Sequence, residues 1–300
     1  MEGTIRHPDV SSVIVGVDGS DSARTAAMWA AAEAVRRDRP LHIVYGADTD
    51  GRGLYLSAEA VEQGRHAGRG LLDETAEAVR AEFPSAHVTT EFSRSDPVTA
   101  LHRAAALHGT IVVGNRGRGG FGSLLLGSVG LKTAAGAKTA MVVVRGAGEA
   151  DEAGVVVVGV RDEHDLECAQ YAAREAELRK ASLRLLHVWN MLQSVGDVAT
   201  MLDNIEDVVG EHVEKLKAVT DRIRDEYPHL TVQADAEKSV SVAGILVEAS
   251  HRADLLVMGG RRSPGYIGPT LGRVTHTLVH HAHCPVLLVP RHGQELWSES

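Results

Sequence analysis

The chain has 300 residues, which is enough for about two domains of ordinary size. Hydrophobic residues make up 44% of it and charged residues 24%, values that exclude an intrinsically disordered chain. A net charge of −9 argues against a protein that neutralises a nucleic-acid backbone. The sequence shows no basic leader followed by an apolar segment and no apolar run of roughly 18 residues, so we expect a cytoplasmic protein without nucleic-acid or membrane partners. Its two cysteines, Cys168 and Cys284, are expected to be reduced, buried thiols.

Short β-branched runs alternate along the chain with longer alanine-rich or amphipathic segments. This alternation predicts βα units and a parallel sheet. In the first half we expect strands near residues 12–17, 41–46, 87–92, 110–114 and 140–144. In the second half we expect them near residues 155–160, 183–189, 230–235, 254–258 and 285–289.

The two halves carry the same landmarks in the same order. The run at residues 12–17 returns at 155–160, an offset of 143, and the run at 140–144 returns at 285–289, an offset of 145. Landmarks that keep their order with such small drifts indicate a duplicated domain.

We therefore predict two tandem domains, residues 1–147 and 154–300. The stretch between Gly146 and Gly154 is rich in Gly, Glu and Asp, which is typical of a linker.

A glycine-rich segment follows the predicted strand at 110–114. Glycines let backbone N–H groups approach phosphate oxygens, and the N-terminus of the following helix favours negative charge. Ser128 is the expected cap of that helix, and Arg116 and Arg118 would add charge-assisted bonds to phosphate. The alternative is a solvent loop whose glycines only form turns. The candidate phosphate-binding residues are Gly114, Arg116, Gly117, Arg118, Gly119, Gly127 and Ser128.

Three other motifs in the chain are weaker. Residues 117–122 spell G-x-G-x-x-G, but they follow the fourth strand and lack an acidic residue about 20 positions further on to hold a ribose. Residues 130–139 approach a P-loop, yet their spacing is wrong and they are predicted to be helical. The histidines between His276 and His283, together with Cys284, contain an i, i+4 pair that would suit zinc. The alternative for them is a helix end where histidines are favoured by the helix dipole.

The spacing Gly114-x-x-Gly117, nine residues, Gly127-Ser128 resembles the ATP-binding pattern G-x2-G-x9-G-[ST] of the universal stress protein family. A first strand that leads into Asp18 is its companion. The resemblance extends over nearly the whole chain, as a tandem of two such domains. It implies an α/β fold of two Rossmann-like (adenine nucleotide alpha hydrolase-like) domains, each a five-stranded parallel sheet with helices on both faces.

The resemblance also implies a cofactor, ATP, with or without Mg²⁺, in the first domain. Asp18 and the turn at Gly46 would meet its adenosine end. The alternative for Asp18 is a turn or helix-capping residue. The resemblance implies that the ribose and phosphates are surrounded by Gly114, Gly117, Gly127 and Ser128. The neighbouring residues Gly16, Gly119 and Val129 would complete the site.

The second half departs from the pattern wherever it matters. Arg161 stands in the place of Asp18, Arg262 in that of Gly117 and Arg273 in that of Ser128. We therefore expect the second domain to bind ATP poorly or not at all. The alternative is that these arginines hold a different anion.

The resemblance implies a nucleotide-dependent stress-response or signalling module that pairs into homodimers through the last strand of a domain and acts on an unidentified protein partner. A second hypothesis is a slow ATPase or nucleotide-processing enzyme of the same fold, which needs a positioned base and carboxylates for Mg²⁺. His42 and Asp96 are residues that folding would have to bring to the site for that role. A third hypothesis, a relative of the electron-transfer flavoproteins that binds FAD or AMP, rests on architecture alone.

Overall fold

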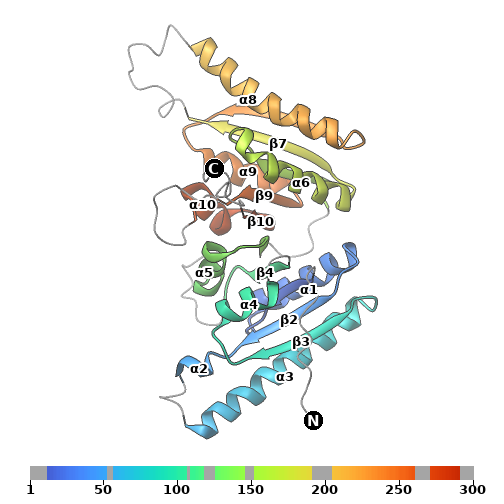
Figure 1. The fold of residues 1–300 in the computed structure, drawn as a ribbon, viewed down its shortest axis with the longest axis vertical. Helices are drawn as coiled ribbons and strands as arrows, with labels where there is room; N and C mark the ends of the chain where they lie inside the picture. Colours follow the sequence, from blue (N-terminus) through green and yellow to red (C-terminus); the bar gives the residue numbers. More distant parts are fainter. Residues whose placement is uncertain are drawn as a thin grey trace, which may run out of the picture. The chain divides into compact units, whose positions relative to one another are not determined.

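The computed structural model describes residues 12–52, 57–106, 109–117, 126–145, 152–190, 205–260 and 271–290. The chain divides into two compact units, Met1–Glu149 and Ala150–Ser300. Each unit contains a five-stranded parallel sheet with helices packed against it (Figure 1). The predicted α/β class is therefore confirmed.

The strands of the first unit lie in the order β3-β2-β1-β4-β5, and all neighbours are parallel. Each strand ends within about two residues of its predicted position. Apolar runs rich in Val and Ile mark strands that are covered on both faces, whereas β3, with the sequence VTTEFS, is largely polar and only partly buried. Their bounds are β1 (Val13–Gly16), β2 (Leu41–Gly46), β3 (Val88–Ser93), β4 (Thr110–Gly114) and β5 (Met141–Val144).

The helices of the first unit form two layers. The pair α1 and α3 pack on one another, and the pair α4 and α5 do the same. Because the chain turns back after β3 to reach β4, right-handed crossovers place the two pairs on opposite faces of the sheet. The helices are α1 (Asp21–Arg36), α2 (Thr49–Arg52), α3 (Ala58–Glu82), α4 (Pro97–Ala105) and α5 (Ser128–Gly136).

The second unit repeats this plan, with strand order β8-β7-β6-β9-β10 and parallel neighbours throughout. Its strands are β6 (Val155–Gly159), β7 (Ser182–Trp189), β8 (Val232–Lys238), β9 (Leu255–Gly259) and β10 (Val286–Val289). Its helical segments are η1 (Glu163–Asp165), α6 (Leu166–Arg179), α8 (Ile205–Glu226), α9 (Val242–Ala249), η3 (Ser250–Arg252) and α10 (Arg273–His281).

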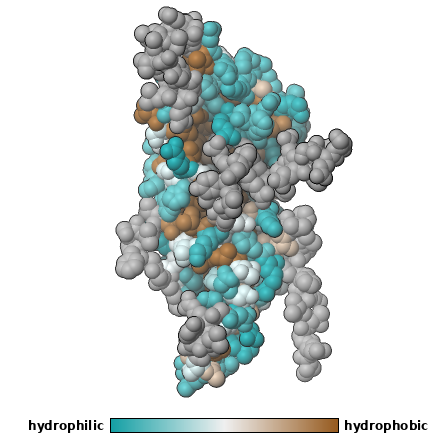
Figure 2. Space-filling model, turned by 60° about the vertical axis from the view of Figure 1, so that its left-hand side comes forward, coloured by the Kyte–Doolittle hydropathy of each residue, from teal (hydrophilic) through white to brown (hydrophobic). Residues whose placement is uncertain are grey.

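Alanines on α1 explain how a chain with 4% aromatic residues builds a tight core. Ala26, Ala27 and Ala30 are fully buried against the valines and isoleucines of the sheet. Small side chains let the helix lie close to the strands, so bulky rings are not needed to fill the gap. Figure 2 shows hydrophilic residues over most of the described surface on the face that it presents, with hydrophobic residues in smaller areas.

The two units fill one equivalent place in the core differently. Tyr45 and His187 each follow the residue that pairs with the last glycine of the central strand. In the first unit Tyr45 stacks on Phe92, and a Cβ atom on Gly68 would lie 2.7 Å from both rings. His212, 144 residues after Gly68, brings a ring to this place in the second unit and contacts His187. In the first unit, glycine on α3 leaves room for two rings from the strands. In the second unit, the ring of His212 on α8 takes the place of one of those two strand rings.

Cys168 and Cys284 are both free and buried, as predicted. Burial raises the pKa of each thiol to about 12, so neither is a reactive thiolate near neutral pH. Among the described residues, no helix combines the length and apolar character needed to cross a bilayer.

Candidate functional site

The candidate site lies at the carboxyl ends of β1 and β4. These strands are neighbours, but the chain leaves β1 toward β2 on one side and reaches β4 only after returning across the sheet. Their connections therefore diverge at this point, which is where open α/β sheets bind ligands. The turn from β1 into α1 and the segment after β4 form its walls.

Asp18 lies in the turn between β1 and α1. Its Oδ1 atom accepts a hydrogen bond from the backbone N–H of Ser20 at 3.0 Å and another from the Ser20 hydroxyl at 2.7 Å. Ser20 is in turn the N-cap of α1, where its Oγ accepts from the N–H of Ala23. Asp18 therefore has the turn role that its residue type favours, and the turn fixes the carboxylate at the edge of the sheet.

Two serines at the start of α1, the N-cap Ser20 and Ser22 in the first turn, hold the segment that follows β4. The Ser22 hydroxyl donates to Oδ1 of Asn115 at 2.7 Å and accepts from the backbone N–H of Arg116 at 3.1 Å. The Ser20 hydroxyl lies 3.3 Å from the carbonyl oxygen of Arg116. These contacts fix the Arg116 backbone while its side chain remains exposed. The serines and Asn115 are site residues that glycine spacing alone does not reveal.

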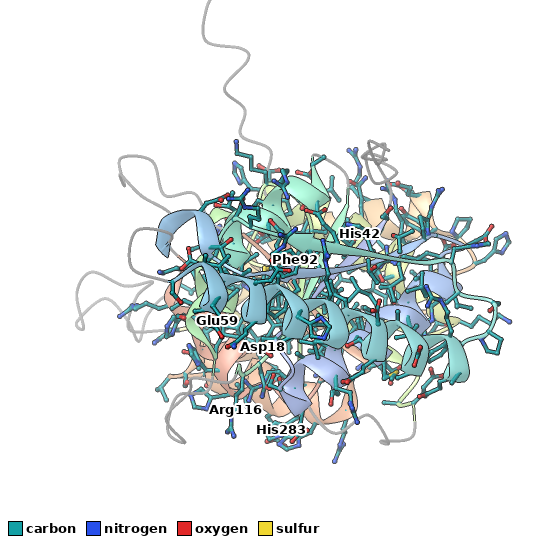
Figure 3. The ribbon with its side chains drawn as sticks, turned by 90° about the horizontal axis from the view of Figure 1, so that it is seen from below. Asp18, His42, Glu59, Phe92, Arg116 and His283 are labelled. Atoms are coloured by element: carbon teal, nitrogen blue, oxygen red, sulfur yellow. The ribbon has the colours of Figure 1, made fainter. Side chains whose placement is uncertain are left out.

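Gly117 lies directly beside Asp18. A Cβ atom on Gly117 would lie 2.6 Å from Oδ2 of Asp18, closer than real Cβ contacts allow. Gly127 is nearby, since its own Cβ position is 3.6 Å from the nitrogen of Gly117 and its N–H bonds to the carbonyl of Asn115 at 3.1 Å. Residues far apart in the sequence thus meet at one edge, and Figure 3 shows Asp18 and Arg116 on the same side of the ribbon, away from His42.

The N-terminus of α5 lies at the same edge of the sheet. Gly127 is the N-cap with extended backbone angles, and Ser128 is already the first helical residue, with Val129 next to it in the first turn. The prediction that Ser128 caps the helix is therefore wrong, because a capping side chain must come from the residue before the first helical one. Gly127 supplies no capping side chain and the first turn has no acidic residue, so its N–H groups favour an anion.

Three of the predicted glycines also have packing reasons to be glycine. A Cβ atom on Gly114 would lie 2.5 Å from the backbone oxygen of Ser22, and one on Gly46 would lie 2.5 Å from Cα of Pro97. Gly16 is less constrained, with its Cβ position 3.2 Å from two carbons of Leu101. All three end strands at the site edge, and their contact with a nucleotide stays a prediction. Arg118 and Gly119 lie outside the described residues.

Arg145 is a further cation at this edge. It follows β5 directly, and β5 pairs with β4 in a register that joins Val144 to Gly114. Burial lowers the pKa of Arg145, and the positive charge of Arg116 lowers it further. Arg145 is not among the site residues predicted from the sequence. A comparison of the two halves could have found it, because Pro290 stands at the equivalent position after the last strand of the second half.

The equivalent edge of the second unit is built differently. The backbone N–H of Arg161 donates to Asp165 at 2.9 Å, and its guanidinium lies 3.2 Å from the Asp162 carboxylate. Gly272 is the N-cap of α10, and Arg273 begins the helix as Ser128 does in the first unit. Arg161 is thus paired with an acidic neighbour, and Arg262 lies outside the described residues.

The histidines near the C-terminus form ring contacts. His276 and His280 have ring centroids 4.4 Å apart, and His251 stacks on His283 at 3.5 Å. Among the described residues no group of three or more His, Cys, Asp or Glu side chains is arranged to hold a metal ion.

The sequence matches the universal stress protein family over residues 10–145 and again over residues 153–290. Universal stress protein Rv2624c of Mycobacterium tuberculosis (strain ATCC 25618 / H37Rv) is 30% identical over 290 residues, which cover 95% of this chain and 98% of that protein. The crystal structure of a universal stress protein from Archaeoglobus fulgidus DSM 4304 is similar in fold, with a TM-score of 0.67 at 17% identity, over 93% of this chain and 98% of that one. A universal stress protein from Archaeoglobus fulgidus in complex with dAMP is 22% identical, matches 45% of this chain and 95% of its own, and has a TM-score of 0.34.

Proposed function

Because both units of this chain belong to the universal stress protein family, we propose that the first unit binds ATP at the carboxyl edge of its sheet. The observation that carries the proposal is the approach of Gly117 to Asp18, where a Cβ atom would lie 2.6 Å from the carboxylate. A residue without a side chain at this place leaves backbone N–H groups accessible beside a fixed carboxylate, which suits a ligand with both hydroxyls and phosphates.

Each part of the nucleotide has a matching part of the edge. The Asp18 carboxylate accepts hydrogen bonds from hydroxyl or amino groups of the nucleoside. The N-terminus of α5, which begins at Gly127 and has no acidic residue in its first turn, favours the phosphates. Arg116 supplies an exposed guanidinium for charge-assisted bonds to them. Mg²⁺ is part of this proposal only as an ion carried by the phosphates of ATP.

We further propose that the second unit does not bind ATP. Arg161 replaces the acceptor Asp18, and its guanidinium is engaged with Asp162. Pro290 replaces Arg145 at the end of the last strand. The second unit therefore has no carboxylate at the position of Asp18 and no cation at the position of Arg145.

Binding, rather than hydrolysis, is the role we propose for the site. His42 is the second residue of β2 and lies toward its amino end, opposite the site edge, where its ring bonds to Thr89 and Glu91. The Asp96 carboxylate accepts the N–H groups of Val98 and Thr99 as the N-cap of α4. Both candidates for a catalytic base thus have structural roles. We propose a cytoplasmic stress-response or signalling module whose nucleotide state controls a protein partner or a homodimer contact.

The test is nucleotide stoichiometry on the purified full-length protein, measured by equilibrium dialysis with labelled ATP. We expect one ATP per chain, at least tenfold weaker binding in Asp18→Ala, and unchanged binding in Arg161→Ala, which alters the equivalent position of the second unit. Two nucleotides per chain would overturn the assignment to the first unit. Release of phosphate at many turnovers per minute would favour the ATPase instead.

A further inference from the structure

The ends of β4 and β5 place two arginines at the same edge of the first unit. Gly114 pairs with Val144 in a parallel ladder, so the chain leaves both strands at the same level and in the same direction. Arg145 is the first residue after β5, and Arg116 is the second residue after β4. Adjacent strands in a sheet lie about 4.8 Å apart, well within the reach of either side chain.

The backbone of Arg116 is held from two sides. Its N–H bonds to the Ser22 hydroxyl at 3.1 Å, and its carbonyl lies 3.3 Å from the Ser20 hydroxyl. Arg116 itself is exposed, whereas Arg145 is partly buried. Arg116 is therefore the more accessible of the two cations, and Arg145 the more buried one.

The two positive charges affect one another. The charge of Arg116 adds to the effect of burial in lowering the pKa of Arg145. Two like charges that affect one another in this way are unfavourable by themselves, and a bound anion of high charge relieves the repulsion. Guanidinium groups match phosphate oxygens in geometry as well as in charge.

The second unit offers an internal comparison. Val289 pairs with Gly259 as Val144 pairs with Gly114, and the next residue is Pro290. Proline has neither a charge nor a backbone N–H. The cation after the last strand therefore belongs to the unit that retains Asp18 and Gly117.

We infer that Arg145, together with Arg116, recognises the terminal phosphates of the nucleotide and makes the first unit select triphosphates over monophosphates. This inference rests on the proposed ATP site and adds a specificity-determining residue to it.

The experiment compares ATP with AMP in the full-length protein and in Arg145→Gln. A lost charge-assisted contact predicts that the affinity for ATP falls roughly tenfold or more, whereas the affinity for AMP stays within about twofold. Arg145→Lys retains the charge and is expected to keep most of the preference for ATP. Arg39→Gln, which removes the same charge just before the amino end of β2, is the control and should leave both affinities unchanged.

Two results would overturn the inference: equal losses for ATP and AMP in Arg145→Gln, or no loss for either. A wild-type protein that binds neither nucleotide contradicts the proposed function itself, so the two failures are distinguishable. Thermal unfolding of both Arg145 variants, with midpoints close to that of the wild type, shows that altered affinity is not loss of fold.

Discussion

The Nε2 atom of His187 lies 2.8 Å from Nδ1 of His212. The other ring nitrogen of His187 is 2.9 Å from the carbonyl oxygen of Val160, which only accepts hydrogen bonds. In the neutral pair, Nδ1 of His187 must therefore carry a proton, Nε2 must accept, and Nδ1 of His212 must donate. His212 also stacks on Trp189, with ring centroids 4.5 Å apart.

This histidine pair predicts loss of stability in mild acid. Burial lowers the pKa of both rings, and the positive charge of Lys215 lowers both further, while Asp162 raises that of His187 and Glu211 that of His212. Because folding favours the neutral rings, their contribution is complete above the ordinary pKa of about 6.5 and is lost as the pH falls through it toward the lower folded values.

Thermal unfolding between pH 8 and pH 5 tests this. We expect the midpoint of His212→Gln to depend less on pH than that of the wild type. His66→Gln, which removes an exposed histidine of α3, should retain the full dependence. Identical slopes for the wild type and His212→Gln would show that the pair does not sense pH.

Gly117→Ala should impair nucleotide binding more than folding. The new methyl group would lie 2.6 Å from Oδ2 of Asp18, so the carboxylate or the loop must move. We expect at least tenfold weaker ATP binding by calorimetry, with a small change in unfolding temperature. Gly64→Ala is the control, because no atom lies within 4 Å of its Cβ position and alanine favours the helix by about 0.5–1 kcal/mol. Normal ATP affinity in Gly117→Ala would contradict the proposed site.

Gly114→Ala and Gly46→Ala should lower the stability of the fold. Their Cβ atoms would meet backbone atoms of Ser22 and Pro97 at 2.5 Å, and backbone moves less readily than the end of a side chain. Overpacking of this kind costs about 1–3 kcal/mol, measurable by urea unfolding. Wild-type stability in either variant would show that the helix N-termini move aside easily.

Two buried glutamates at equivalent places predict unequal losses. Glu33 is fully buried and bonds to Arg36 at 2.8 Å and Arg37 at 2.6 Å, whereas Glu175 bonds to Arg179. The Arg179 side chain is only 6% exposed, against 27% for Arg36 and 16% for Arg37. Removing the charge of one member of a buried ion pair costs about 3–5 kcal/mol, and solvent reduces that cost where the other member is exposed.

Glu175→Gln should therefore destabilise the protein more than Glu33→Gln does. Urea unfolding of the two variants and the wild type measures the difference. A larger loss in Glu33→Gln would contradict the argument from burial.

The strand positions and the duplication were predictable because apolar β-branched runs mark buried strands and the landmarks at the two ends of each half recur at offsets of 143 and 145. The capping of α5 was not, since glycine and serine are both good N-caps and only the backbone angles decide between them. The packing roles of Gly46 and Gly114 depend on where α4 and α1 begin relative to the strand ends. The histidine pair joins residues that are 25 positions apart in the sequence and meet only because α8 packs on the sheet. A local sequence pattern cannot predict such a contact.

The exchange between Gly68 and His212 limits how the two copies have diverged. In the first unit the rings of Tyr45 and Phe92 leave room only for glycine at residue 68, and in the second Ala236 stands opposite His187 where Phe92 stands opposite Tyr45. Moving any one of these side chains into the other copy creates a clash or a void. We therefore expect that exchanging one of these side chains between the two halves disturbs the packing, unless the helix residue and both of its strand neighbours are exchanged together.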